Sequence, residues 1–369
     1  MKKLMLGLFL SFLIVPGIWI AAEGLTGRAE TYSDAEQRML ATFPASVTMD
    51  NLDQIGGQIE TYINDHAPFR DEQVALNAKL DYQLFDSTDT PTVTLGKNGW
   101  LFYAGQNSTD DFRGLGSRSE EWHQTAANLL NGIDATLEAQ GIEFVVLFAP
   151  NKERIYKEYM PDYITMVNER NRLDVLVDYL RTSTNIPIVY PKECFEDKSY
   201  QWYYKTDTHW NNAGGFLAGQ ELIQTLGGEP WDISQVTVGY TPRGTGDLVR
   251  LAHLPSGEFD ETEAMVEGYL LETVLHMTED TSYYPSLKFY TSENAPDPRH
   301  IVIYRDSFAD AITATMARYF ARVDTYWWNS GAENRMGQEK PDVVVYEILE
   351  RYIDERMIDD LNKLSQVWQ

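Results

Sequence analysis

The sequence His300-Ile301-Val302-Ile303-Tyr304-Arg305-Asp306-Ser307-Phe308 joins an apolar run to a short polar turn. Residues 300–304 are typical of a buried β-strand. After the turn, apolar side chains recur with helical spacing at Phe308, Ala311, Ile312, Met316, Tyr319 and Phe320. The stretch therefore predicts a strand, a turn at Ser307 and a helix. A serine at such a turn lies at the carboxyl edge of a parallel sheet, where backbone N–H groups of the helix start can stabilise an oxyanion.

The chain on either side of this stretch alternates between strand-like and helix-like segments. Strand-like runs occupy residues 143–149, 186–190, 301–304, 323–328 and 343–346. Helix-like runs occupy residues 122–137, 169–182, 211–226, 308–320 and 351–364, and a capping-box pattern starting at Ser117 precedes the first. This order predicts an α/β fold with a doubly wound parallel sheet and helices on both faces. Residues 231–299 do not fit the alternation, and we expect them to form an insertion over the carboxyl edge of the sheet.

The first 90 residues follow a different pattern. Two lysines precede an apolar run at residues 4–20, which is near the lower length limit of a membrane span, about 17 residues. Residues 1–22 are expected to be a signal anchor or a cleaved signal peptide, with a buried core helix as the alternative. Residues 23–90 are interpreted as a stalk with helices within residues 52–86 that break at Pro68, and residues 91–369 as the main domain. The main domain would begin with a hairpin that turns at Asn98-Gly99.

This N-terminal segment also predicts where the protein lies. The remainder of the chain would be extracytoplasmic, either anchored to the cytoplasmic membrane by residues 4–20 or secreted after cleavage. Cys194 is the single cysteine, so no intramolecular disulfide can form. The formal net charge of −26 argues against nucleic acid as a partner and favours a neutral glycan over a polyanionic one.

A second polar motif, Tyr203-Tyr204-Lys205-Thr206-Asp207-Thr208-His209-Trp210-Asn211, immediately precedes a predicted helix. A serine hydroxyl becomes a good nucleophile when an imidazole removes its proton, and a carboxylate can fix the tautomer of that imidazole. Asp207 and His209 share a face in an extended segment, so they can supply the base and the group that orients it. Loops at the carboxyl edge of a doubly wound sheet converge, which can bring this motif to Ser307.

Simpler interpretations of both motifs remain open. Asp306-Ser307-Phe308 can be only a helix N-cap. Asp207-Thr208-His209 can be a metal pair or an N-cap beside a packed histidine. No third His or Cys lies nearby at ligand spacing, and Asp65-His66 is typical of a helix break, so we expect no metal.

Several ordered blocks carry a family resemblance. The two polar motifs are accompanied by Asn64-Asp65-His66-Ala67-Pro68-Phe69-Arg70, Gly96-Lys97-Asn98-Gly99-Trp100-Leu101-Phe102-Tyr103, Pro150-Asn151-Lys152, Gly246-Asp247-Leu248 and residues 343–352. Over about residues 35–355 the chain resembles SGNH-hydrolase-like proteins of the alginate O-acetyltransferase and DHHW group. Arg305 stands where many members have glycine, and Thr208 where the DHHW branch has histidine.

The resemblance implies an extracytoplasmic α/β/α domain that transfers acetyl groups to a cell-surface or secreted polysaccharide. It makes Ser307 the nucleophile, His209 the general base and Asp207 its orienting carboxylate, in a permuted order in which the Asp-His block comes first. No cofactor is implied. A membrane-bound acyltransferase of the MBOAT type is implied as the partner that supplies the acetyl group. A carbohydrate acetyl esterase with the same three residues and a catalytically inactive glycan-binding or assembly protein are the alternatives.

Four further residues are weaker candidates for the site. Asn329 follows the strand after the Ser307 helix and can be a second oxyanion donor or a turn asparagine. Arg305 can bind a substrate carboxylate or pair with Asp306. Trp202 and Trp210, like Trp327 and Trp328, can stack on sugar rings or belong to the core.

Overall fold

The computed structural model describes most of the chain. The described residues are 5, 7, 9, 14, 15, 17–20, 22, 26, 31–33, 38–44, 52–67, 70–85, 87, 88, 90–270 and 272–368. Contacts divide the chain into two compact units: one contains Met1–Thr92 and Val249–Glu258, and the other contains Val93–Leu248 and Phe259–Gln369. The candidate site residues Ser307, His209 and Asp207 all belong to the second unit.

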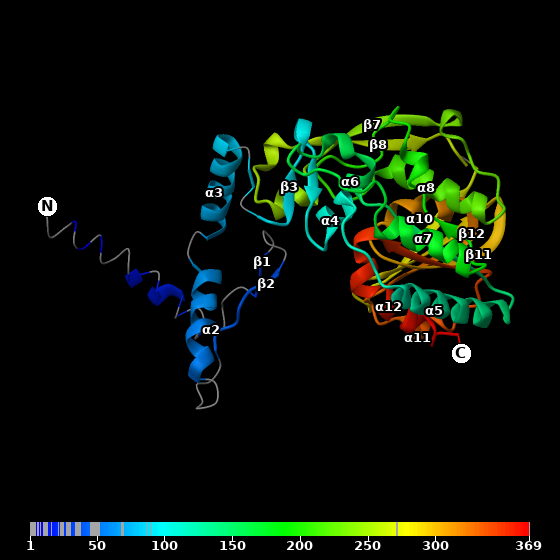
Figure 1. Cartoon of the computed structure of the whole chain (residues 1–369), viewed down its shortest axis with the longest axis horizontal. Helices are drawn as coiled ribbons and strands as arrows, with labels where there is room; N and C mark the ends of the chain where they lie inside the picture. Colours follow the sequence, from blue (N-terminus) through cyan, green and yellow to red (C-terminus); the bar gives the residue numbers. More distant parts are fainter. Residues whose placement is uncertain are drawn as a thin grey trace. The chain divides into compact units, whose positions relative to one another are not determined.

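The first unit contains two predicted helices, α2 (Leu52–Asp65) and α3 (Arg70–Phe85), and a short antiparallel pair of strands, β1 (Tyr32–Ser33) and β2 (Arg38–Met39) (Figure 1). Pro68, the predicted break, lies between the helices but outside the described residues. Within the described part of the chain, no helix combines the length and hydropathy of a membrane span. Much of the apolar run 4–20 lies outside the described residues, so the anchor or signal peptide stays a prediction, as does the boundary between residues 1–22 and 23–90.

The second unit is built on a seven-stranded sheet with the order β6-β5-β13-β11-β12-β10-β9. Five neighbouring strands are parallel: β6 (Ile188–Val189), β5 (Glu143–Ala149), β13 (Val343–Leu349), β11 (Asp297–Arg305) and β12 (Phe320–Trp327). β10 (Leu287–Glu293) pairs antiparallel with β12, and β9 (Val274–Asp280) pairs antiparallel with β10. The predicted α/β fold is confirmed, but the sheet is mixed: the predicted parallel pairing holds for five strands, and the β10–β9 edge is antiparallel. The reason is that β9 and β10 follow each other through a short turn, which permits only antiparallel pairing.

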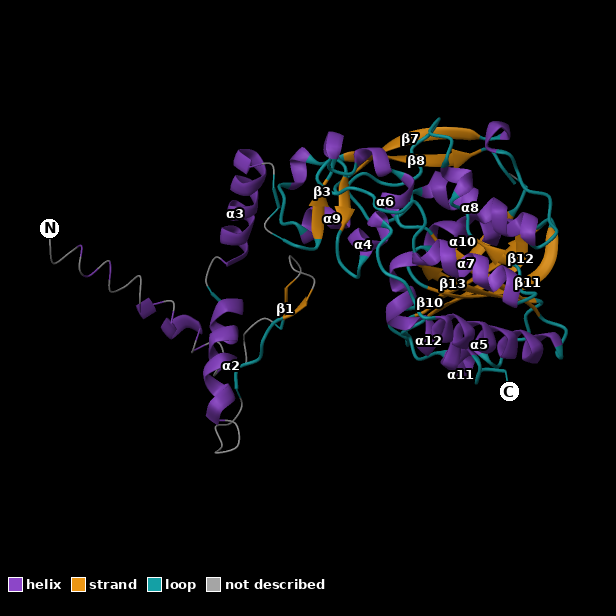
Figure 2. Ribbon diagram, in the orientation of Figure 1, coloured by secondary structure: helices purple, strands orange, loops and turns teal. Residues whose placement is uncertain are grey.

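Helices cover both faces of the sheet (Figure 2). Helices α8 (Asn212–Thr225) and α10 (Ala309–Tyr319) share one hydrophobic cluster with Ile301 and Ile303 of β11. Helices α5 (Glu120–Glu138), α7 (Arg172–Ser183) and α12 (Ile353–Leu364) share the opposite cluster with Val302 and Tyr304. Alternate residues of β11 thus point to opposite faces of the sheet. Because helices cover both faces, successive residues of β11 are apolar.

Shorter elements complete the second unit. The predicted hairpin is confirmed as β3 (Val93–Leu95) and β4 (Leu101–Tyr103), and Asn98 and Gly99 in its turn have φ angles of 57° and 78°. The helix cap of α5 differs from the prediction: Ser119, not Ser117, accepts a hydrogen bond from the backbone N–H of Trp122. The remaining short helices are α4 (Ser108–Arg113), α6 (Lys152–Ile155) and α11 (Glu333–Met336), while α9 (Asp247–Leu251) crosses the boundary between the units.

Residues 231–299 contain two antiparallel hairpins. The first pairs β7 (Thr237–Arg243) with β8 (Glu261–Glu267). The second is the β9–β10 pair that extends the main sheet. The β7–β8 hairpin carries side chains that hydrogen-bond the loop containing Asp207, so this segment helps to position the candidate site.

Candidate active site

Ser307 lies at the turn between β11 and α10, and the preceding Asp306 holds this turn in place. One carboxylate oxygen of Asp306 accepts a hydrogen bond from the backbone N–H of Phe308 at 3.0 Å. The other accepts from the backbone N–H of Leu349 at 2.9 Å and from the guanidinium of Arg356 at 2.6 Å. Asp306 and Arg356 are both buried. The turn that presents Ser307 is thus tied to β13 and α12 rather than left as a free loop.

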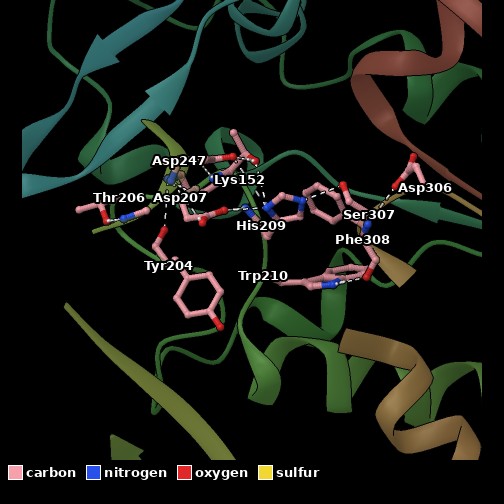
Figure 3. A network of polar contacts seen from close by, with 12 residues as sticks. Lys152, Tyr204, Thr206, Asp207, His209, Trp210, Asp247, Asp306, Ser307 and Phe308 are labelled. Atoms are coloured by element: carbon pink, nitrogen blue, oxygen red, sulfur yellow. Dashed lines mark hydrogen bonds and ion pairs between the residues drawn. The ribbon is translucent and has the colours of Figure 1, made fainter. Parts of the chain in front are cut away.

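The structure brings Ser307, His209 and Asp207 into one hydrogen-bonded chain (Figure 3). His209 Nε2 lies 2.7 Å from Ser307 Oγ, and His209 Nδ1 lies 2.6 Å from Asp207 Oδ1. An ionised carboxylate only accepts hydrogen bonds, so the Nδ1 proton faces Asp207 and Nε2 accepts from the Ser307 hydroxyl. This arrangement can move a proton from the serine to the histidine.

Asp207 is buried and is surrounded by donors. Its Oδ1 also accepts from the backbone N–H of His209 at 3.1 Å, and its Oδ2 accepts from Arg243 Nη2 at 3.0 Å and from the backbone N–H of Asp247 at 3.4 Å. Burial by itself raises the pKa of Asp207, but hydrogen bonds and charges from His209 and Arg243 outweigh it and hold this pKa below its ordinary value. Asp207 therefore stays ionised and can stabilise a protonated His209.

Lys152 fixes the backbone of the loop that carries these residues. Its Nζ donates to the carbonyl oxygens of Tyr204 and Lys205, each at 3.1 Å, and to that of Asp207 at 2.6 Å. Only 3% of Lys152 is exposed. Burial lowers the pKa of Lys152 to about 8, so the side chain is an ammonium at neutral pH and each of its three N–H groups has an acceptor.

Two carboxylates from residues 243–263 complete the support of this loop. Glu261 accepts from the backbone N–H of Lys205 and from the hydroxyl of Thr206, each at 2.6 Å. Asp247 accepts from the backbone N–H of Thr208 at 2.9 Å and from its hydroxyl at 2.8 Å. The sequence places Lys152 and Asp247 in resemblance blocks but gives neither of them a role, and nothing in its local pattern marks Arg243 or Glu261.

A pocket of about 370 Å³ opens at Ser307 and His209. It is lined by Tyr204, His209, Trp210, Asn212, Arg243, Glu263, Ser307, Phe308, Asp310, Ala311 and Ala314. A larger pocket of about 610 Å³ lies beside β6, and its lining does not include Ser307, His209 or Asp207. We therefore choose the smaller pocket as the candidate site because Ser307 and His209, which can exchange a proton, line it.

The weaker tryptophan candidates are largely core residues. Trp202 and Trp210 are each 1% exposed. Trp202 Nε1 donates to the carbonyl of Asp197, and Trp202 does not line the site pocket, so of its two predicted roles the structure favours a place in the core over stacking on a sugar. Trp210 lines the pocket wall, and its Nε1 donates to the carbonyl of Phe308 at 2.8 Å, which supports the turn after Ser307.

Arg305 and Asn329 do not reach the pocket either. Arg305 is 1% exposed, lies 4.0 Å from the ring centre of Trp327, and pairs with Asp310 at 2.9 Å, so it cannot bind a substrate carboxylate. It contacts Asp306 only by donating to its backbone carbonyl at 3.1 Å. Asn329 is exposed and lines a different pocket beside Trp328. The structure therefore does not bring Asn329 to Ser307 as an oxyanion donor.

A metal pair is the competing interpretation of Asp207 and His209. Together with Asp247 these residues offer ligand atoms that lie within 4.8 Å of one another. However, the facing atoms of Asp207 and His209 already hydrogen-bond each other, and the second oxygen of Asp207 accepts from the cationic Arg243. A metal cation would have to displace the histidine and would lie close to the guanidinium. The donor set fits a catalytic chain better than a metal site.

Replacing Arg243 with methionine should reduce stability at neutral pH and make acid unfolding begin at a higher pH. A carboxyl whose pKa is lowered by folding stabilises the protein fully above its unfolded pKa, about 3.9, and loses that contribution as the pH falls through the folded pKa. Without Arg243 the pKa of Asp207 rises, so the contribution shrinks. Urea unfolding measured across acid pH checks this.

The matched control is Arg170→Met, which breaks an ion pair with Asp178 whose side chains are both 61% exposed. Exposed pairs contribute little, so this variant should follow the wild-type acid profile. Equal acid profiles for Arg243→Met and Arg170→Met would contradict the assigned role of Arg243.

Together, the fold and the site define a class of protein: an α/β domain with a strand-to-helix serine and an Asp-x-His motif that precedes it in the chain. Residues 93–267 match the family model described as "SGNH hydrolase-like domain, acetyltransferase AlgX". The matched range contains Asp207 and His209 and ends before Ser307.

Curated relatives and solved structures agree with this class. The protein named "Probable alginate O-acetylase AlgJ" from Pseudomonas fluorescens is 25% identical over 242 residues, which cover 62% of this chain and 55% of that protein. The chain spans about half the length of the curated relatives it matches. Bacillus cereus PatB1 matches with a TM-score of 0.54 and 15% identity, over 72% of this chain and 98% of that one.

A DHHW family protein from Eubacterium siraeum matches with a TM-score of 0.53 and 13% identity, over 74% of this chain and 98% of that one. At these identities the structural matches show a shared fold. The resemblance to SGNH-hydrolase-like proteins of the alginate O-acetyltransferase and DHHW group is confirmed.

Proposed function

We propose that this chain is an extracytoplasmic O-acetyltransferase that transfers an acetyl group through an acyl-Ser307 intermediate to a hydroxyl of a cell-surface or secreted polysaccharide. The observation that carries the proposal is the chain from Ser307 Oγ through His209 to Asp207, with distances of 2.7 Å and 2.6 Å. The relatives named as alginate O-acetylases favour acetyl transfer to a polysaccharide over other reactions of a serine nucleophile.

The first half of the proposed reaction forms the acetyl-enzyme. Ser307 Oγ attacks the acetyl carbonyl of the donor while its proton passes to His209 Nε2. The bond between the carbonyl carbon and the donor oxygen then breaks, and the leaving oxygen takes the proton from His209. Asp207 stabilises the imidazolium that exists between these two steps. The products are acetyl-Ser307 and the deacetylated donor.

The second half repeats these steps with a sugar hydroxyl as the attacking group. His209 accepts the hydroxyl proton while the sugar oxygen bonds to the acetyl carbon. The bond to Ser307 Oγ then breaks, and Ser307 recovers its proton from His209. Water in place of the sugar would give an esterase, so the transferase requires an acceptor that reaches the pocket ahead of water.

One backbone N–H group at the turn, that of Ser307, is suited to stabilise the oxyanion in both halves. The N–H of Phe308 is used by Asp306 at 3.0 Å. Within the described part of the chain, the N–H of Ser307 donates to no protein acceptor. It therefore remains available to the negative charge that develops on the carbonyl oxygen of the acetyl group when Ser307 Oγ attacks the carbonyl carbon.

Location and donor complete the proposal. The apolar run 4–20 supports an anchor in the cytoplasmic membrane, or secretion if the run is cleaved. The family resemblance supports a membrane-bound acyltransferase of the MBOAT type as the acetyl supplier, because acetyl-coenzyme A is not available outside the membrane. The polysaccharide is the acceptor, and the chemistry uses side chains without a bound cofactor.

The acetyl-enzyme can be tested directly with p-nitrophenyl acetate. The intact protein should gain the mass of one acetyl group, located on Ser307, together with a burst of nitrophenolate. Ser307→Ala should show neither. Acetylated sugar formed when oligosaccharides are added supports the transferase, whereas hydrolysis with no transfer to any sugar supports an esterase. A burst that persists unchanged in Ser307→Ala would refute the proposed nucleophile.

A further inference from the structure

The pocket at Ser307 contains little positive charge. Arg243 is the one Lys or Arg among the described residues that line it. Its Nη2 donates to Asp207 at 3.0 Å, and its guanidinium carbon lies 3.6 Å from the ring centre of Tyr204. Its Nη1 is buried, makes no hydrogen bond to the described residues, and lies 3.9 Å from Glu261. The guanidinium of Arg243 is therefore committed mainly to Asp207, and its buried Nη1 is not presented to a carboxylate of an incoming ligand.

Two carboxylates face the same pocket. Asp310 is 48% exposed and already pairs with the buried Arg305 at 2.9 Å and, more distantly, with Lys288 at 3.9 Å. Glu263 accepts a hydrogen bond from the hydroxyl of Tyr204 and has no basic partner among the described residues. Glu263 is thus a lining carboxylate whose hydrogen-bond partner is a hydroxyl and not a lysine or arginine.

These charges act differently on neutral and acidic sugars. A free carboxylate oxygen of Glu263 can accept a hydrogen bond from a sugar hydroxyl, and such charge-assisted bonds are strong. A uronate carboxylate in the same pocket would lie in a partly desolvated space shared with Glu263 and Asp310, where the one lining cation, Arg243, already pairs with Asp207. Like charges placed together in this way weaken binding and disfavour the wrong partner.

We infer that the acceptor of this pocket is a neutral glycan and that Glu263 is a specificity-determining residue that excludes uronates. This inference rests on the proposed function. It names a substrate class that the relatives do not suggest, since those are named for alginate. The net charge of −26 over the whole chain points in the same direction at long range.

The test uses two acceptors, a uronate oligosaccharide and its methyl ester, in which esterification removes the negative charge and adds one small methyl group. Both present the same hydroxyls, so acetyl transfer from p-nitrophenyl acetate to each can be compared directly and normalised to the rate of acetyl-enzyme formation. The ester should be acetylated at least about tenfold faster than the free uronate, because only the uronate meets Glu263 with a like charge. Added salt should raise the uronate rate more than the ester rate.

Two variants assign the effect to one residue. Glu263→Gln keeps the size and one acceptor oxygen but removes the charge, so it should narrow the gap between ester and uronate. Glu267→Gln removes a charge from the same strand, β8, at an exposed position that does not line the pocket, and should leave the gap as in the wild type.

The possible results separate this inference from the proposed function. Equal acetylation of uronate and ester, or a gap that Glu263→Gln does not change, overturns the inference. So does acetyl-Ser307 that forms and passes to neither acceptor. If no acetyl-enzyme forms on Ser307 at all, the proposed function itself fails.

Discussion

Replacing Asp207 with asparagine should slow acetyl-enzyme formation by a factor on the order of 10³ to 10⁴, the loss expected when the orienting carboxylate of a serine-histidine pair is neutralised. The Asp207 carboxylate accepts four hydrogen bonds and donates none: two come from His209, one from Arg243 and one from the backbone N–H of Asp247. An asparagine side chain replaces one of the two accepting oxygens with an NH₂ group, which only donates. Whichever way it turns, its NH₂ group meets two other donors.

The same argument predicts a structural cost for Asp207→Asn. A buried donor left without an acceptor destabilises a protein by about 1 to 3 kcal/mol. Burst kinetics with p-nitrophenyl acetate and urea unfolding measure the two effects separately. The control is Asp247→Asn, because the carboxylate of Asp247 lies 3.9 Å from His209 Nδ1 and holds Thr208 instead. Its effect on the burst rate should be below about tenfold, since the Asp247 side chain hydrogen-bonds Thr208 and neither Ser307 nor His209. Equal losses in both variants would contradict the role of Asp207.

Replacing Lys152 with methionine should produce the second large effect. Methionine fills a similar volume but leaves three buried carbonyl oxygens, those of Tyr204, Lys205 and Asp207, without their common donor. Each unpaired group costs about 1 to 3 kcal/mol if the loop does not move. We expect the loop to shift, which moves His209 away from Ser307, so that both the unfolding free energy and the burst rate fall.

The pH dependence distinguishes the ammonium of Lys152 from a simple packing role. Burial lowers the pKa of Lys152 to about 8. Above that pH the neutral amine has two N–H groups for three carbonyls, so the burst rate of the wild type should decline. Stability should respond in the opposite direction. Between about 8 and the unfolded value, about 10.4, the unfolded chain binds more protons than the folded chain, so this group makes stability rise with pH.

Lys152→Arg is the matched control because arginine keeps its charge throughout this range. If Lys152→Arg folds, its burst rate should lose the decline above about pH 8 that the wild type shows. If the burst rate of Lys152→Arg declines above about pH 8 as the wild-type rate does, the decline arises from the titration of another group. A Lys152→Met variant with normal stability and an unchanged burst rate would show that the loop does not depend on this lysine.

Much of the fold was accessible from the sequence because buried strands and amphipathic helices have distinct periods. The apolar runs at residues 143–149 and 343–346 correspond to β5 and β13, which are covered on both faces. The antiparallel edge was missed. The side chains of β9 are all exposed or half-buried, so the strand has no buried face that would impose a run or an alternation of apolar residues. Its pairing with β10 depends on tertiary context instead.

Some residues of the candidate site could likewise be predicted from the sequence, and others could not. The residues that meet at Ser307 were predicted from motifs at strand and loop ends, where chemistry requires particular side chains. Arg305 was misjudged because an arginine beside a candidate nucleophile suggests ligand binding, whereas it is buried against Trp327 and Asp310. Lys152 and Arg243 were missed because their function depends on acceptors from another segment, and no local pattern reveals such convergence.

The hydrogen bonds around the loop at residues 204–209 also bear on the order in which the protein becomes active. The loop is held by Lys152, which precedes it in the chain, and by Arg243 and Glu261, which follow it, while Ser307 comes later still. A chain made only as far as β8 already has the base and its carboxylate but no nucleophile. Such a chain also lacks β11, β12 and β13, three of the five parallel strands, so we expect the proposed acetyl-enzyme to form only once the strand and turn that carry Ser307 are present.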